Sequence, residues 1–131
     1  MVEGLLNGQD EFASERFLAP DLIVHEVANT LFVQHRVLHT IPDGLPYVER
    51  LFRAIETGSL ILVPVTEDLA VAAYKIASGN AAAVYDCVFI ALALQREMQL
   101  KTRDRKQAEI LELERRKRSA QKHPDDKARR E

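Results

Sequence analysis

Apolar residues recur every three or four positions along several stretches of this 131-residue chain, which is the spacing of amphipathic helices. Residues 21–39 form the first predicted helix, which ends near Thr40 because the residue before Pro42 is pushed out of the helical region of backbone space. Residues 43–57 form the second, closed by Gly58. The predicted inward positions of the two helices are Ile23, Val24, Val27, Ala28, Leu31, Phe32, Leu45, Val48, Leu51, Phe52 and Ile55.

The run LILVPV at residues 60–65 has a different pattern, because it is continuously apolar and rich in β-branched residues. Such a run indicates a buried strand of a parallel sheet, with Pro64 at the strand end. Thr66 then caps a further helix, which the pair Gly79-Asn80 is expected to break.

Residues 82–97 form a predicted helix with a broad apolar face and no Gly or Pro inside it. The run 98–103 alternates Met98, Leu100 and Thr102 with polar residues, and this indicates a short strand before a new helix begins at residue 104. Strands that alternate with helices predict an α/β fold of three layers, in which a short parallel sheet is flanked by helices. Right-handed crossovers would place the carboxyl ends of the strands along one edge.

Charge is distributed unevenly along the chain. Residues 1–100 carry 6 basic and 13 acidic side chains, or −7, whereas residues 101–131 carry 12 basic and 7 acidic ones, or +5. We therefore expect one domain over residues 1–113, followed by a basic tail at residues 114–131. The tail suits a solvated helix end and flexible segment, an arm that touches RNA phosphates, or a segment ordered by a partner.

The first sixteen residues do not have the pattern of a strand. They suit the remains of a helix followed by a polar loop, in which Asp10 and Glu11 lie. Residues 17–19 form a short apolar segment that ends at Pro20.

Composition narrows the class of protein. The chain is 47% hydrophobic and 29% charged, which is typical of a globular domain. It has no apolar run near the roughly 20 residues of a membrane span and no secretory leader, so we expect a cytoplasmic protein without a membrane partner. The single cysteine, Cys87, excludes an internal disulfide and a cysteine-based zinc site, and it suits a small core residue.

Three carboxylates stand out from their surroundings. Asp86 lies in the first turn of an apolar helix, and Asp104 follows the short predicted strand. Each suits a helix cap, and each also suits a ligand position at the edge of an open α/β sheet. Glu26 heads a partly polar stripe beside the apolar face of the first helix, where a solvated side chain is the default. Convergence of Asp86 and Asp104 on one sheet edge would favour a site over two separate caps.

Three segments carry a more specific signal through their order and spacing. They are Ala19-Pro20-Asp21-Leu22 followed by His25-Glu26-Val27-Ala28-Asn29, then Ala83-Val84-Tyr85-Asp86 running into Ala91-Leu92-Ala93, then Leu100-Lys101-Thr102-Arg103-Asp104-Arg105. This ordered set resembles a PIN domain of the VapC toxin type, and the resemblance runs from about residue 12 to residue 111.

The resemblance implies a metal-dependent endoribonuclease of a toxin–antitoxin system. In that family, acidic side chains hold Mg²⁺ or Mn²⁺, which activates a water to attack an RNA phosphodiester. The matching positions here are Glu26, Asp86 and Asp104 as metal ligands, with Thr102 as the hydroxyl beside the last Asp. The resemblance also implies an RNA substrate, a homodimer, and an antitoxin that inserts an Arg or Lys among the carboxylates.

The chain departs from the family pattern at its start. PIN domains open with a central apolar strand that ends in the first acidic ligand, and nothing before Phe17 matches it. A full-length relative would place that strand before Met1, so the chain reads as beginning inside the first helical region. Without it, the neighbouring strands would stand about two 4.8 Å spacings apart, so they must close up, borrow a strand, or leave the fold marginal. The acidic set is then incomplete, and catalysis is expected to be weak, lost, or dependent on residues outside this sequence.

Two other readings stay open. A catalytically defective PIN-like module would bind an antitoxin or itself without cutting RNA, and a tail-driven RNA binder would lose affinity steeply with salt. His35 and His39 have the spacing of a zinc pair, but no Cys or acidic partner is placed with them. No Gly-rich phosphate loop or G-x-S-x-G elbow is present, which argues against a nucleotide-dependent enzyme or a serine hydrolase.

Overall fold

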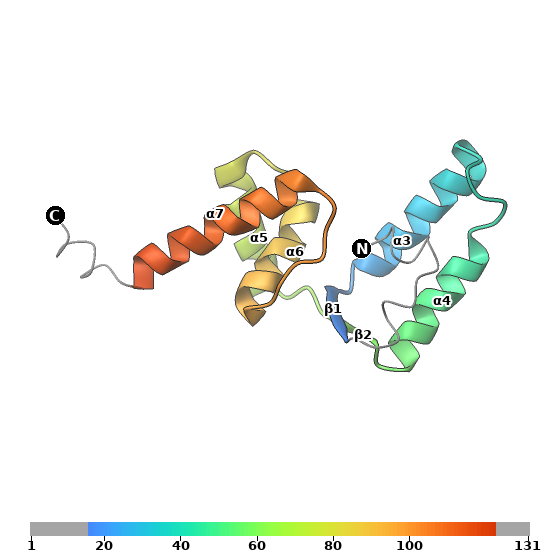
Figure 1. Cartoon of the computed structure of the whole chain (residues 1–131), viewed down its shortest axis with the longest axis horizontal. Coiled ribbons are helices and arrows are strands. Elements are labelled where there is room, and N and C mark those ends of the chain that lie inside the picture. The colour runs from blue at the N-terminus through green and yellow to red at the C-terminus, as the bar shows by residue number, and fades with distance from the viewer. Residues whose placement is uncertain (1–15, 123–131) are drawn as a thin grey trace. The chain divides into compact units, whose positions relative to one another are not determined.

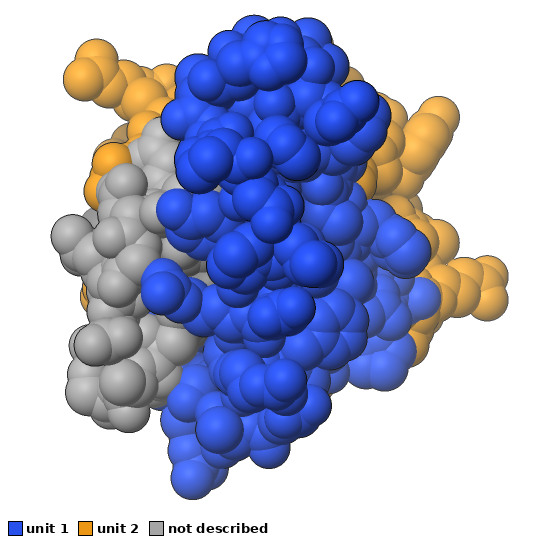
Figure 2. Space-filling view, turned by 90° about the vertical axis from the view of Figure 1, so that its right-hand side faces the viewer, with its two compact units in different colours: residues 1–65 blue, residues 66–131 orange. Residues whose placement is uncertain are grey.

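The computed structural model describes residues 16–122, and Figure 1 traces its elements along the chain. The chain forms two compact units that divide between Val65 and Thr66, and Figure 2 colours them blue and orange. The first unit holds the sheet, and the second is helical.

The N-terminal unit contains a parallel sheet of two strands, β1 (Phe17–Pro20) and β2 (Leu60–Val63). Phe17 lies opposite Leu60 and Pro20 opposite Val63. The Phe17 amide donates to the Ser59 carbonyl at 2.8 Å, and the Asp21 amide donates to the Val63 carbonyl at 2.9 Å. The strand predicted at residues 60–65 is confirmed over its first four residues, and the apolar segment at residues 17–19 is a strand that the sequence pattern did not indicate.

Two helical segments flank this sheet in the same unit. They are α3 (Ile23–Phe32), which continues into the short π-helix η1 (Val33–Val37), and α4 (Leu45–Glu56). Gly44 lies against α3, where an added Cβ would stand 3.0 Å from the Leu31 Cβ. Gly58 follows the end of α4 and has a φ of 80°, which glycine adopts without steric cost. The buried residues are Ala19, Pro20, Ile23, Val27, Leu31, Gly44, Leu51, Ala54 and Leu60. The inward positions predicted at Ala28, Phe32, Leu45 and Phe52 are wrong, because these side chains are exposed. The predicted α/β fold with a short parallel sheet flanked by helices is confirmed.

The C-terminal unit packs three helices: α5 (Glu67–Asn80), α6 (Val84–Arg96) and α7 (Arg105–Lys122). As predicted, Thr66 caps α5, and its hydroxyl oxygen accepts the Leu69 amide at 3.3 Å. The break expected at Gly79-Asn80 is present but lies slightly later, because α5 runs through Asn80 and ends at Ala81, which has a φ of 49°.

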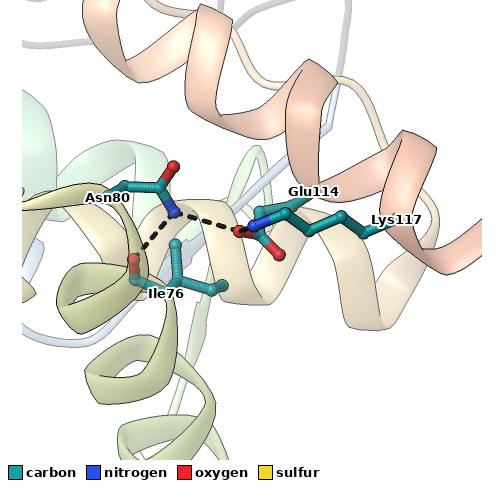
Figure 3. Close-up of polar contacts among 4 residues, drawn as sticks. All are labelled: Ile76, Asn80, Glu114 and Lys117. Carbon is teal, nitrogen blue, oxygen red and sulfur yellow. Dashed lines mark hydrogen bonds and ion pairs between the residues drawn. The ribbon is translucent and has the colours of Figure 1, made fainter.

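Contacts with α7 explain why α5 continues through Asn80 (Figure 3). The side-chain nitrogen of Asn80 donates to the Ile76 carbonyl at 2.8 Å and to a Glu114 carboxylate oxygen at 3.0 Å. The Lys117 ammonium donates to the same Glu114 oxygen at 3.2 Å. Ile110 and Leu111 of α7 are also buried. Helix α7 therefore packs on the unit through both apolar and polar contacts, and it extends past residue 113 to Lys122.

Helix α6 is the core of the C-terminal unit. All eight residues from Cys87 to Leu94 are buried, so α6 is covered on every side rather than on one face. Its predicted extent, residues 82–97, is close to the observed one. Val84, at the first position of the helix, is 42% exposed and lies outside the core.

The strand predicted at residues 98–103 is wrong, since the run forms no strand in the described structure. Helices α6 and α7 run in the same direction, because Gln107 contacts Asp86 near their starts and Arg118 contacts Leu94 further along. The connection 97–104 must therefore return along the about 20 Å length of α6. Its eight residues can span about 26 Å when extended. The run 98–103 is therefore extended enough to cross this distance, but it does not pair with a neighbouring strand and so forms no sheet.

Some sequence-based expectations lie outside the described residues. They are the helix remnant and loop before Arg16, with Asp10 and Glu11, and the end of the tail beyond Lys122. Within residues 16–122, no single helix has the length and apolar character to cross a membrane, and α5 and α6 pass that test only together, across a 116° bend.

Candidate active site

Asp86 lies in the first turn of α6, three residues after the N-cap Ala83. The residue is half-buried, and the next residue, Cys87, is fully buried. The unsatisfied amides and the dipole of a helix N-terminus favour a negative charge at this place. A negative charge on Asp86 therefore interacts favourably with the start of α6.

Asp104 caps α7 through one carboxylate oxygen. Its Oδ1 accepts the Lys106 amide at 2.9 Å and the Gln107 amide at 3.3 Å. The cap that the sequence suggested is therefore present. Both contacts use Oδ1, so capping does not occupy Oδ2, and the side chain is exposed.

Thr102 supports the turn that carries Asp104. Its hydroxyl oxygen accepts the Asp104 amide at 3.1 Å, and its O–H donates to Gln107 Oε1 at 2.7 Å. The proton of the hydroxyl is thus engaged within the turn. This geometry suits a side chain that orients Asp104.

Gln107 is the residue that sequence reasoning missed. Its side-chain nitrogen donates to the Asp86 backbone carbonyl at 3.0 Å, while Oε1 accepts from Thr102 and its backbone amide donates to Asp104. One residue therefore contacts all three predicted site residues of this unit. The spacing Asp104-x-x-Gln107, which resembles a capping box, was the available signal.

The starts of α6 and α7 lie together, since Gln107 in the first turn of α7 bonds to the first turn of α6. Two helix N-termini thus point their partial positive charges at one end of the unit. Lys106 adds a full positive charge there, and its Nζ lies 3.4 Å from the Ala81 carbonyl oxygen. This end can stabilise carboxylates and can also receive an anionic substrate.

Cys87 lies behind Asp86 and takes no part in this polar surface. Burial raises the pKa of the Cys87 thiol above its ordinary value, and the negative charges of Asp86 and Glu114 raise it further, against an opposing effect of Lys106. The thiol therefore stays protonated near neutral pH. This supports the expectation of a structural core cysteine rather than a nucleophile.

Glu26 belongs to the other unit. It lies half-buried in the first turn of α3, next to the buried residues Ile23 and Val27. The structure thus brings Asp86, Thr102 and Asp104 together in the C-terminal unit and places Glu26 at the start of a helix in the N-terminal unit.

Carboxylate and hydroxyl oxygens are the donors that Mg²⁺ prefers, and this ion is commonly held by one or two carboxylates together with waters and substrate phosphate. Asp86 and Asp104 fit that chemistry. Among the described residues of each unit, no three His, Cys, Asp or Glu side chains form a ready-made metal group. Asp86 and Asp104, at the start of α6 and α7, are therefore candidate ligands only.

The histidine pair lies elsewhere, in the N-terminal unit. His35, Arg36, His39, Thr40, Ile41 and Pro42 line a hollow of about 460 Å³. An arginine between the two histidines disfavours a cation there, and no third ligand accompanies them in the described chain.

Comparison with known proteins identifies the family. The family model described as PIN domain matches residues 2–113. The comparisons with curated proteins and with solved structures give no match. PIN domains are a nuclease family, and they generally use divalent metal ions. The match covers most of the chain and ends within α7, and it contains every residue of the candidate site, so this chain belongs to the PIN domain family.

Proposed function

We propose that this protein is a divalent-metal-dependent endoribonuclease that hydrolyses RNA phosphodiester bonds, with Asp86, Asp104 and Glu26 as its acidic ligands. The observation that carries the proposal is the hydrogen-bonded group Asp86, Thr102, Asp104 and Gln107 at the shared start of α6 and α7. It links the backbone of Asp86 to the cap residue Asp104, so the residues that carry two carboxylates lie at neighbouring helix starts within a chain of a nuclease family.

Each residue of the group has a distinct part in the proposal. Asp86 and Asp104 supply oxygen ligands, Thr102 orients Asp104, and Gln107 fixes the spacing between the two helix starts. The two helix N-termini favour the binding of the scissile phosphate. Mg²⁺ or Mn²⁺, when bound, supplies a more acidic water and neutralises charge on the phosphate.

We further propose that the nuclease acts as the toxin of a toxin–antitoxin system and forms a homodimer. Large apolar side chains exposed at α3, η1 and α4 support protein partners, and they are Phe32, Val37, Leu38, Leu45 and Phe52. An antitoxin cation could pair with Asp86 and Asp104 in place of the metal.

A second candidate function is a PIN-like interaction module that binds an antitoxin or itself without cleaving RNA. The partial ligand set in the described residues favours this alternative. The two functions differ in whether the carboxylates bind metal and support hydrolysis.

The test is Mn²⁺-dependent cleavage of a structured RNA by the full chain and by its Asp86→Asn variant. Asp68→Asn is the matched control, because Asp68 also lies in the first turn of a helix, α5, but is exposed and outside the site. The nuclease proposal expects cleavage by the parent and the control, and none by Asp86→Asn.

Equal cleavage by all three proteins would indicate a contaminating nuclease and contradict the assignment of Asp86. No cleavage by any of them, with Mn²⁺ present and the fold intact by circular dichroism, would favour the interaction module.

A further inference from the structure

A hollow of about 410 Å³ lies between the end of α6 and the middle of α7, away from the carboxylates. Its lining is Leu94, Glu97, Met98, Gln99, Arg115, Arg118 and Ser119. All of these belong to the C-terminal unit, so the hollow is built by one packed set of helices. Its volume is within the range of small-ligand sites, roughly 300–1,000 Å³.

The arginines of this hollow differ from their neighbours in the basic run 115–118. Arg116 pairs with Glu112 at 3.3 Å, and Lys117 pairs with Glu114 at 3.2 Å. Arg115 and Arg118 donate instead to neutral carbonyl oxygens, those of Met98 and Leu94. These two hydrogen bonds hold the guanidinium groups in place through neutral acceptors, whereas Arg116 and Lys117 donate to carboxylates.

The local charges leave the hollow positive. Glu97 lines it too, and the end of α6 carries a partial negative charge of about half an electron. Two guanidinium groups outweigh these charges. Each has five N–H donors in a planar fork, of which the carbonyl contact uses one.

The rest of the lining favours a nucleotide over a bare anion. Leu94 and Met98 provide an apolar wall for the face of a base, while Gln99 and Ser119 offer hydrogen-bonding groups for its edge. Arginine planes also stack on unpaired bases of single-stranded RNA. A phosphate and a base can thus be satisfied in the same hollow.

The hollow is in reach of the same RNA strand as the carboxylates. Arg115 and Arg118 stand 11 and 14 residues after Asp104, which is roughly 16–21 Å along α7. A single strand of a few nucleotides covers that distance. Residues in the hollow would therefore hold substrate remote from the bond that is cut.

We propose that this hollow is a subsite for one nucleotide of single-stranded RNA, in which Arg115 and Arg118 bind the phosphate and Leu94 and Met98 contact the base. The inference rests on the proposed ribonuclease function for its substrate class. The subsite acts in binding and positioning, and it takes no part in the chemical step.

The test measures binding of a short, labelled single-stranded RNA by fluorescence anisotropy, in the Asp86→Asn background so that no RNA is consumed. Arg118→Gln should raise the Kd about tenfold. It should also reduce the magnitude of the slope of log K against log salt by about 1, the value expected for the loss of one phosphate contact. Arg116→Gln is the matched control, because it removes the same charge from the adjacent position, where Arg116 is 75% exposed and paired with Glu112. It should change the Kd less than about twofold.

Since Arg118 also holds the end of α6, the thermal midpoint of each variant is measured alongside. Arg118→Lys keeps the charge but not the fork, and it should restore the salt slope while recovering only part of the affinity. The subsite would be overturned if the Kd for RNA changed in proportion to the thermal midpoint of the variants and not to the charge at position 118. Equal losses of RNA affinity for Arg116→Gln and Arg118→Gln would also overturn it. Binding of polyglutamate by a protein that does not bind the RNA would also overturn it, and would favour an acidic protein partner.

The outcomes separate this inference from the proposed function. Loss of RNA binding with Arg118→Gln, in a protein whose parent does not cleave RNA, would retain the subsite and reject the nuclease. Cleavage by the parent with KM and Kd unaffected by Arg118→Gln would retain the nuclease and reject the subsite.

Discussion

In the described part of the N-terminal unit, side-chain hydrogen bonds such as Arg53 to Glu56 and Thr40 to Gln34 join residues two to six positions apart. Several of those in the C-terminal unit join α7 to α5, α6 or the segments that follow those helices, across 17 to 34 positions. Backbone pairing of two strands and apolar packing therefore hold the first unit. The second adds polar contacts that fix where its helices begin and end, and the candidate site lies at one such place.

The largest effect should come from the core of the C-terminal unit. Ile90→Ala removes a fully buried side chain from α6 and should lower the free energy of unfolding by about 2–5 kcal/mol, because a cavity remains. Denaturant unfolding followed by circular dichroism measures the loss. Val84→Ala, on the exposed start of the same helix, should cost less than about 1 kcal/mol. Equal losses would contradict the description of α6 as the core.

An intermediate effect is expected from the polar group at the helix starts. Gln107→Ala removes hydrogen bonds to Asp86 and Thr102 and should cost about 1–3 kcal/mol. The control is Gln95→Ala, at an exposed position of α6. If Gln107 positions the carboxylates, its loss should also weaken Mn²⁺ binding about tenfold, measured by calorimetry. A stability loss with unchanged Mn²⁺ affinity would leave Gln107 a purely structural role.

The smallest effect is expected in the local contacts of the N-terminal unit. Arg53→Ala breaks an ion pair with Glu56 in which both side chains are more than 60% exposed. Such a pair contributes less than about 1 kcal/mol, since water and salt screen it. Thermal unfolding at low and high salt should differ little between variant and parent. A loss as large as that of Gln107→Ala would erase the contrast between the two units.

Local signals in the sequence predicted most helices, because periodicity, Thr66 and Gly58 act within a few residues. They failed where a distant residue decides. Helix α5 ends two residues later than the pair Gly79-Asn80 suggested, and Asn80 there donates a hydrogen bond to Glu114, 34 positions later. The pattern of residues 98–103 is that of a strand, but a strand requires a partner, which periodicity does not report. The segment at residues 17–20 was missed because it is short and ends in proline.

The candidate site was predictable in its residue types and only partly in its arrangement. Motif order singled out Asp86, Thr102 and Asp104, and the structure links them through hydrogen bonds. Gln107 was not predicted, because its contact with Asp86 joins residues 21 positions apart and produces no periodic pattern in the sequence. Whether Glu26 shares a metal with these carboxylates remains a prediction that binding measurements can test.

The most direct test of the account is a Mn²⁺ titration of the full chain by calorimetry, beside Asp86→Asn, Asp104→Asn, Glu26→Gln and the control Asp68→Asn. The account predicts that the parent and the control bind Mn²⁺ and that each of the three site variants binds it at least about tenfold more weakly. Binding that survives in both Asp86→Asn and Asp104→Asn, or no binding by the parent, would contradict a metal site at the start of α6 and α7.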